Sequence, residues 1–206
     1  MIHPATRIGF VSEAIGNGVF ATAPLPRGTL LVVQDAFDQC LTRAHFQALP
    51  PVLRDSLETY LYHNKRGELV LGWDHAKYIN HSCTSNSLMT DYGLEIVVRD
   101  IAAGEEITTD YGLLNVQEPY ELYCNCQPCR GRLALDDIDR LADLWDQQIC
   151  DALQQAPRLQ QPLWPLLSAA TVEALSRLSS DLASYRSVRG LKWRCDAAVV
   201  DRIAAD

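Results

Sequence analysis

The stretch YINHSCTSN, residues 78–86, decides how this sequence is interpreted. A thiol, Cys83, follows its Asn-His-Ser run, and CNCQPC at residues 124–129 brings three more thiols, the first 41 positions after Cys83. The chain has seven cysteines, an odd number that cannot all pair with one another. The N-terminus, MIHPATRIGFVSE, lacks the pattern of a signal peptide. We therefore expect a cytoplasmic or nuclear protein, whose thiols serve metal binding, catalysis or packing rather than disulfides.

Cys124, Cys126 and Cys129 have the spacing C-x-C-x2-C, and a tight turn can direct all three thiolates to one metal ion. Structural zinc takes four ligands in a tetrahedron, so a fourth must come from elsewhere. The candidates are Cys40, Cys83, Cys150, Cys195 and the histidines. Cys83 is favoured because it lies in a polar, loop-like stretch, whereas Cys150 and Cys195 lie in helical contexts typical of core cysteine. The alternative is three unrelated buried thiols, but such crowding is uncommon without a metal.

Composition limits the remaining functions. The chain has 206 residues, of which 48% are hydrophobic, enough to bury the core of one sizeable domain. Its net charge of −8 argues against direct nucleic-acid binding and suits a cationic partner such as a lysine-rich peptide, although mild acidity also simply aids solubility. No apolar run is long enough to span a bilayer, so we expect no membrane partner.

The first part of the chain is predicted to be rich in strands. Residues 6–34 read as short strands and turns, and residues 65–73 as a hairpin turn at Gly67 that leads into a strand. Residues 93–112 alternate apolar and polar side chains in two strands around a turn at Ala103-Gly104. Residues 41–63 look helical on either side of a proline pair. There, one apolar face is predicted from Leu53, Leu57, Tyr60 and Leu61.

After Gly131 glycine nearly disappears, and the pattern becomes helical. Residues 133–155 predict an amphipathic helix. Its apolar stripe is Ile138, Leu141, Leu144, Trp145 and Ile149. Further helices are predicted near residues 169–184 and 194–204. The sequence therefore indicates a β-rich domain of about 130 residues followed by a helical tail.

Four motifs resemble, in the same order, those of the SET-domain protein-lysine methyltransferases. They are GNGVFAT at 16–22, YINHSCTSN at 78–86, GEEITTDYG at 104–112 and CNCQPCRG at 124–131. The resemblance covers roughly residues 6–131. It implies a mainly β fold with α, the SET-domain β-clip of small curved sheets around a knot-like core, plus a C-terminal helical segment. It also implies the domain limits: a SET domain at 1–115, a post-SET zinc-binding segment at 116–131 and a helical C-terminal extension at 132–206.

The same resemblance implies an activity, the transfer of a methyl group from S-adenosyl-L-methionine to the lysine amine of a protein or peptide. Tyr111 is implied to be catalytic, because its hydroxyl orients the amine. The implied cofactor-binding residues are Gly16, Asn17, Gly18, Asn80, His81 and Tyr111. In the family, the cysteine of the NHSC run joins the three post-SET cysteines on one structural zinc. The implied metal ligands are therefore Cys83, Cys124, Cys126 and Cys129.

The sequence departs from the family pattern at Thr109, where Phe or Tyr is common, which suggests a roomier channel and di- or trimethylation. The post-SET spacing is also tighter than usual. We interpret Glu105 and Asp110 as structural. The aromatic residues that could line a lysine channel are interpreted instead as packing: Tyr60, Tyr62, Trp73 and Tyr78. Two alternative functions stay open, a catalytically silent, zinc-stabilised binding module and a methyltransferase acting on a small amine.

Overall fold

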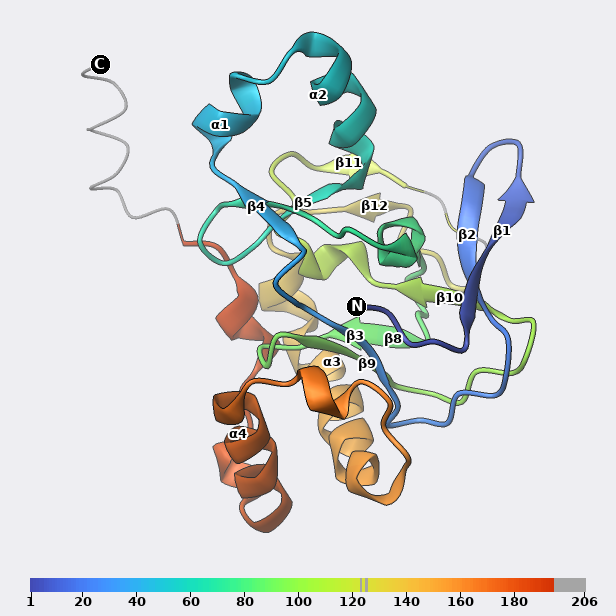
Figure 1. Cartoon of the computed structure of the whole chain (residues 1–206), viewed down its shortest axis with the longest axis vertical. Helices are drawn as coiled ribbons and strands as arrows, with labels where there is room; N and C mark the ends of the chain where they lie inside the picture. The colour runs from blue at the N-terminus through green and yellow to red at the C-terminus, as the bar shows by residue number, and fades with distance from the viewer. Residues whose placement is uncertain (123, 125, 195–206) are drawn as a thin grey trace.

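The computed structural model describes residues 1–122, 124 and 126–194. Small sheets and short helices make up the upper part of Figure 1, and the helices that follow residue 136 lie below and beside them. None of the helices in the described part of the chain combines the length and apolar character needed to span a bilayer. The mixture of small sheets with a C-terminal helical segment confirms the predicted fold class.

Four small sheets form the β part. The first has the order β1 (Thr6–Ser12), β2 (Gly16–Ala21), β10 (Glu106–Thr109), β7 (Asn80–His81). The second has the order β3 (Leu30–Val33), β9 (Leu94–Val97), β8 (Ser87–Met89). The third has the order β4 (Gln39–Leu41), β6 (Leu69–Leu71), β5 (Leu61–His63). The fourth pairs β11 (Tyr120–Glu121) with β12 (Arg132–Leu133).

The helices are mostly short. The α-helices are α1 (Arg43–Gln47), α2 (Pro51–Leu57), α3 (Asp137–Gln155) and α4 (Ala169–Ser180). The 3₁₀ turns are η1 (Glu58–Tyr60), η2 (His75–Tyr78), η3 (Tyr111–Leu113), η4 (Ala156–Arg158), η5 (Trp164–Leu166), η6 (Leu182–Ser184) and η7 (Val188–Leu191). The helix predicted near 169–184 is therefore α4 followed by η6, and the one predicted near 194–204 lies outside the described residues.

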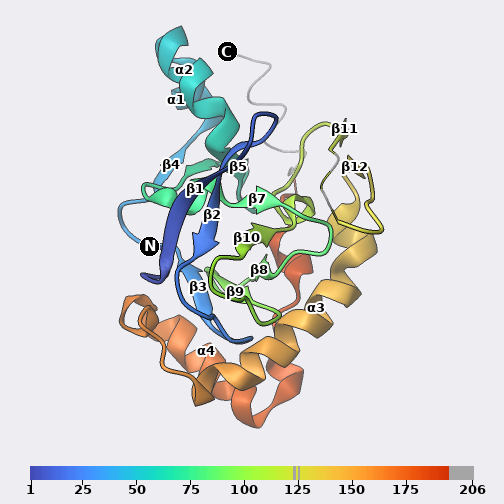
Figure 2. The same cartoon turned by 90° about the vertical axis from the view of Figure 1, so that its right-hand side faces the viewer.

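The pairing of β7 with β10 positions the functional motifs. The two strands run parallel, with Asn80 opposite Thr108 and His81 opposite Thr109. The backbone N–H of Ser82 continues the ladder by donating to Thr109 O at 3.0 Å. Figure 2 shows β7 and β10 side by side, with β11 and β12 beyond them. The NHSC and DYG motifs therefore lie next to each other, although about thirty residues of chain separate them.

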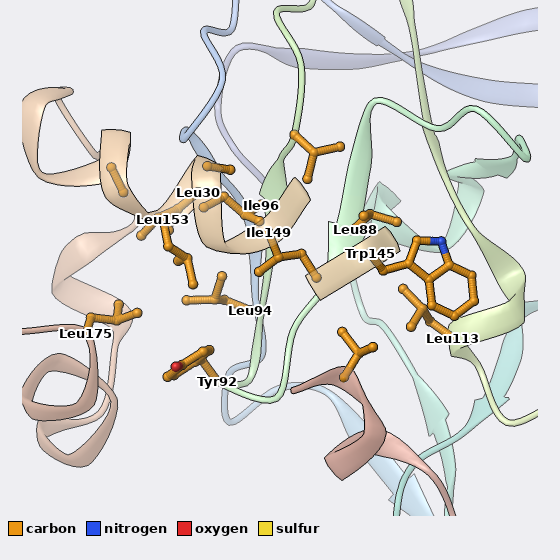
Figure 3. Close-up of a cluster of buried hydrophobic side chains, with 14 of the residues drawn as sticks. Leu30, Leu88, Tyr92, Leu94, Ile96, Leu113, Trp145, Ile149, Leu153 and Leu175 are labelled. Atoms are coloured by element: carbon orange, nitrogen blue, oxygen red, sulfur yellow. The ribbon is translucent and has the colours of Figure 1, made fainter. Parts of the chain in front are cut away.

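The larger hydrophobic core lies between the β3-β9-β8 sheet and the helices that follow residue 136 (Figure 3). Ile138, Trp145 and Ile149 of α3 are buried in it, as predicted. The prediction for Leu144 was wrong, because this side chain is 54% exposed. At 100° per residue Leu144 projects about 120° away from the centre of the buried face. Ala142, Ala152 and Leu153 complete that face instead.

The prediction for residues 41–63 was correct in part. α1 and α2 lie on either side of the proline pair, but residues 61–63 form strand β5, which pairs with β6 across the turn at Gly67. The left-handed φ of +75° at Gly67 suits glycine in this turn. The helical face predicted from Leu53 to Leu61 does not exist, because none of the α2 residues is buried. The β5–β6 ladder satisfies backbone groups that a continued helix would have satisfied internally.

Candidate functional site

Four thiols from two separate segments meet at one point. The Sγ atoms of Cys83, Cys124, Cys126 and Cys129 all lie within 4.8 Å of one another. Cys124 Sγ lies 3.6 Å from Cys83 Sγ, 3.5 Å from Cys129 Sγ and 2.7 Å from Cys126 Sγ. A tetrahedral zinc ion with Zn–S bonds of ~2.3 Å separates its sulfurs by ~3.8 Å. The donor set therefore fits zinc, and binding would move Cys126 Sγ away from Cys124 Sγ by about 1 Å.

The other candidate ligands lie elsewhere or outside the described residues. Cys40 lies on β4 and Cys150 on α3, and neither belongs to a potential metal-binding group among the described residues. Cys195 lies outside the described residues. The structure thus places Cys83, as the resemblance implied, next to the three clustered thiols.

The thiols differ in acidity. Burial raises the pKa of Cys124, but hydrogen bonds from the Cys126 thiol and from backbone N–H groups outweigh burial and lower the pKa to about 6. Burial raises the pKa of Cys83 to about 12. Cys124 therefore loses its proton more readily than Cys83, and binding of zinc would release the proton of Cys83.

His81 connects the thiol cluster to Tyr111. Its Nδ1 accepts the backbone N–H of Tyr111 at 3.1 Å, and its Nε2 lies 3.3 Å from Cys83 Sγ. Burial lowers the pKa of His81, so the imidazole is neutral. Because Nδ1 accepts, the single ring proton lies on Nε2 and points to the Cys83 sulfur. The imidazole therefore works as a spacer between a thiol and the backbone of residue 111.

Arg130 makes a second connection, which the sequence reasoning missed. Its guanidinium donates to both carboxylate oxygens of Asp110, at 2.6 and 2.7 Å, and its backbone N–H donates to Cys83 Sγ at 3.4 Å. Asp110 is fully buried and also caps η3 by accepting the Gly112 N–H at 3.0 Å. This supports the interpretation of Asp110 as structural. The available signal was position, since Arg130 directly follows Cys129.

The predicted cofactor-binding residues gather at the start of β2 and on β7. Asn80 Nδ2 donates to Asn17 O at 3.1 Å and to Glu106 Oε1 at 2.8 Å. A Cβ on Gly18 would lie 2.6 Å from Glu106 Oε1 and 2.8 Å from Asn80 Nδ2, so only glycine fits there. Gly16 has a φ of +81° and open space around it. The backbone at 16–18 thus lies directly against Asn80 and is exposed at Asn17 and buried at Gly18. Sequence reasoning did not include Glu106.

A cavity of about 740 Å³ opens beside Tyr111. The Tyr111 hydroxyl donates to Ile79 O at 2.9 Å, and burial raises its pKa, so the phenol is neutral. None of the predicted cofactor-binding residues except Tyr111 lines this cavity. Tyr111 therefore lies at a junction, since it lines the cavity while its backbone N–H donates to His81 Nδ1.

Tyrosines dominate the aromatic part of the cavity wall. Tyr60, Tyr62 and Tyr120 line it together with Tyr111, and Thr109 lines it as a buried residue. Tyr78 packs edge-on against Tyr60, with ring centroids 5.1 Å apart. The expectation that Tyr60 and Tyr62 serve packing alone thus missed their position at the cavity. From the sequence alone they could line a lysine channel, but packing is preferred because aromatic residues at helical spacing are more often packed in a core.

Comparison with known proteins bears on the same region. Residues 16–112 match the family model described as "SET domain". Among solved structures, the chain is similar to the crystal structure of a Plasmodium falciparum "putative histone methyltransferase", with 19% identity and a TM-score of 0.39. The match covers 53% of this chain and 95% of that one. A search of the curated proteins found no match.

Proposed function

Because residues 16–112 match the SET-domain family model, we propose that the protein is a lysine methyltransferase that uses S-adenosylmethionine and a structural zinc ion. The observation that carries the proposal is the position of Tyr111, between the edge formed by residues 16–18, 80 and 81 and a separate cavity lined by tyrosines. Such an arrangement lets a methyl donor and its acceptor meet from two sides.

The cofactor would bind at the edge of β2 and β7. Asn80 is held by Asn17 O and by Glu106, and the open backbone at Gly16 leaves room for a ligand. S-adenosylmethionine, when bound there, would supply an electrophilic methyl group on its sulfonium. The chain's own part is to fix the amide of Asn80 before the ligand arrives, which reduces the entropy cost of alignment.

Tyr111 would orient the acceptor amine. Its hydroxyl hydrogen is committed to Ile79 O, so the oxygen lone pairs stay free to accept a hydrogen bond from an amine. That bond directs the nitrogen lone pair away from the phenol. Half-buried aromatic walls would also lower the pKa of a lysine amine, because they disfavour its charged form.

The charge of the cavity favours a lysine side chain as the acceptor. Six carboxyl groups line it against three Lys and Arg side chains and the N-terminal ammonium group of Met1. The carboxyl groups belong to Asp38, Glu58, Asp74, Asp91, Glu95 and Glu118. This excess attracts a cationic peptide, and the size of the cavity suits a side chain together with neighbouring backbone. We propose a protein or peptide substrate on this basis.

The four thiols would hold zinc in a structural role. The ion would fix the segment after residue 116 to the NHSC motif and would take no part in methyl transfer. We keep the limits 1–115 for the SET domain, 116–131 for the zinc-binding segment and 132–206 for the extension. Within the extension, α3 shares the core of the β3-β9-β8 sheet, so it supports the SET domain as part of one folded body.

The test is incubation of the zinc-loaded protein with methyl-labelled S-adenosylmethionine and a cell lysate. We expect labelled protein bands with the natural chain and a loss of about a hundredfold with Tyr111→Phe, because the amine is no longer aligned. The matched control is Tyr185→Phe, which also removes a half-buried, hydrogen-bonded phenol, 2.8 Å from Asp146 and outside the site. It should keep the activity.

Two results would favour the alternatives. Label found only in small metabolites would indicate a methyltransferase of small amines. Binding of S-adenosylmethionine without any transfer of label would indicate a catalytically silent binding module. Equal activity of the Tyr111→Phe variant and the natural chain would contradict the role given to the phenol.

A further inference from the structure

One carboxyl group in the cavity wall lies where an apolar residue would be expected. Glu95 is in the middle of β9, whose four residues are all buried, and it is only 7% exposed. Its neighbours Leu94 and Ile96 belong to the large hydrophobic core, whereas Glu95 lines the cavity on the other side of the strand. A carboxylate buried without a cation is costly for stability, so its presence calls for an explanation.

The surroundings of Glu95 satisfy only part of the hydrogen-bonding capacity of its carboxyl group. Across the sheet it lies opposite Val32 on β3 and Met89 on β8, and both of these apolar residues line the cavity too. Ser87 Oγ donates to Glu95 Oε1 at 2.6 Å. The Thr109 hydroxyl is near enough to lower the carboxyl pKa but is not in hydrogen-bonding geometry. Among the described residues, no group donates to Oε2 and no Lys or Arg pairs with the carboxylate.

Two tyrosines lie close to this carboxyl group. Both tyrosines line the same cavity as Glu95. Burial raises the pKa of Tyr62 and of Tyr111, and the charge of Glu95 raises both further, so the phenols are neutral. The other titratable groups that act on Tyr62 are Asp38 and Cys40. A carboxylate and aromatic rings in the wall of one cavity are the combination that recognises an alkylammonium group, through charge and through cation–π contact.

We propose that Glu95 binds the charged amino group of the substrate in this cavity and accepts a proton from it. The inference rests on the proposed function. In the step, the N–H bond of the ammonium breaks, the nitrogen keeps the electron pair, and the proton joins the free carboxylate oxygen of Glu95. The neutral amine then faces Tyr111, and the carboxylic acid returns the proton to water after the product leaves.

The environment lowers the free energy that this proton transfer requires. Burial raises the pKa of Glu95, while the hydrogen bond from Ser87 and the nearby Thr109 hydroxyl oppose that shift. The same aromatic surroundings lower the pKa of an amine, so the two values move toward each other. Proton transfer between groups of similar pKa needs little free energy, which is the condition for general-base catalysis.

Binding of a lysine side-chain analogue tests the proposal without turnover. n-Butylammonium and the neutral n-butanol are titrated into the zinc-loaded protein and followed by NMR chemical shifts. For Glu95→Gln, which keeps the shape and the acceptor for Ser87, we expect roughly a tenfold to hundredfold loss of n-butylammonium affinity. n-Butanol binding should stay the same. The matched control is Glu173→Gln, the same exchange outside the cavity, at a carboxyl group on α4 that pairs with Arg177 at 2.8 Å, and it should leave both affinities unchanged.

Equal n-butylammonium affinity in the natural chain and Glu95→Gln would overturn the proposal, as would an equal loss in Glu173→Gln. Should Glu95→Gln fail to fold, n-butylammonium affinity is measured in Glu95→Asp and Ser87→Ala instead. Glu95→Asp shortens the side chain that carries the carboxylate, and Ser87→Ala removes the hydrogen bond that holds the carboxylate in place. Unchanged n-butylammonium affinity in both variants would also overturn the proposal.

Turnover separates this inference from the proposed function. With a lysine peptide as substrate, Glu95→Gln should shift the rising limb of the kcat/KM profile to higher pH, because solvent must then take the proton. An identical profile in the two proteins would contradict the proton transfer. If no peptide is methylated while n-butylammonium binding still depends on Glu95, the proposed function is contradicted, whereas Glu95 as the binding site of an ammonium group is supported.

Discussion

Replacement of Arg130 by methionine is expected to destabilise the protein by about 3 kcal/mol. The change removes both charge-assisted hydrogen bonds to Asp110, at 2.6 and 2.7 Å, and leaves a carboxylate that is fully buried. Loss of one partner from a buried ion pair costs about 3–5 kcal/mol. The Arg130 side chain is 20% exposed, which places the expected cost at the lower end of that range. Such a loss is a large share of the total stability of a domain, about 5–15 kcal/mol.

A double-mutant cycle isolates the cause. Asp110→Asn combined with Arg130→Met removes both charges while an amide oxygen still accepts the Gly112 N–H, so the double variant should be more stable than Arg130→Met alone. The matched control is Arg177→Met. Arg177 pairs with Glu173 at 2.8 Å on the surface of α4, where such a pair contributes about 0.5 kcal/mol or less.

The assay is urea unfolding in buffer with zinc and a reductant, followed by tryptophan fluorescence, since Trp145 is buried in the core. The reasoning is refuted if Arg130→Met and Arg177→Met differ by less than about 1 kcal/mol, well below the cost of an unpaired buried charge. It is also refuted if the double variant is less stable than Arg130→Met, because the unpaired carboxylate would then not be the source of the loss.

Three further predictions concern the metal, the cavity and pH. Cys124→Ser should lower the zinc content from about one ion per chain to nearly none, measured by atomic absorption, whereas Cys150→Ser should leave it unchanged. We expect di- or trimethyl product from the natural chain, and Thr109→Tyr should narrow the cavity so that mass spectrometry finds mainly monomethyl product. Mainly monomethyl product from the natural chain would contradict this. Burial lowers the pKa of His3 below its ordinary 6.5. The unfolded chain therefore binds the proton more readily, and the free energy of unfolding should fall as the pH drops below 6.5, by at most about 1.4 kcal/mol per pH unit for this group. Urea unfolding between pH 7.5 and 5.5 should show a smaller fall in the free energy of unfolding for His3→Gln than for the natural chain.

Much of the framework was predictable because it depends on local pattern. The apolar stripe of α3 has the period of a helix, and the neighbouring carboxamide, imidazole and thiol of residues 80–83 form a motif in continuous sequence. Residues 61–63 were mispredicted because Tyr60 and Leu61 continue a helical period from α2. The strand that competes for them, β6, begins only six residues after β5 ends, and a short hairpin overrides weak helix propensity.

The functional groups that sequence reasoning missed depend on tertiary structure. In the sequence LEIV, the glutamate reads as the solvent-facing position of an amphipathic strand. Only the fold reveals that both faces of β9 are covered, one by the helical core and the other by the cavity wall. Arg130 likewise reads as a surface residue until β7 and β10 bring Asp110 within its reach.

The contacts of the Cys83 sulfur explain how a metal ion could matter to a cavity that it does not touch. The sulfur accepts a hydrogen bond from the Arg130 N–H, and the Arg130 guanidinium binds Asp110, which caps η3. The sulfur also lies against His81, whose Nδ1 accepts the backbone N–H of Tyr111 in η3. Two independent connections from one atom fix both the position and the rotation of that turn. Loss of the metal should therefore displace the whole Tyr111 residue, whereas Tyr111→Phe removes only its hydroxyl. The two changes can abolish the same activity for different reasons, and only the first should also lower the free energy of unfolding.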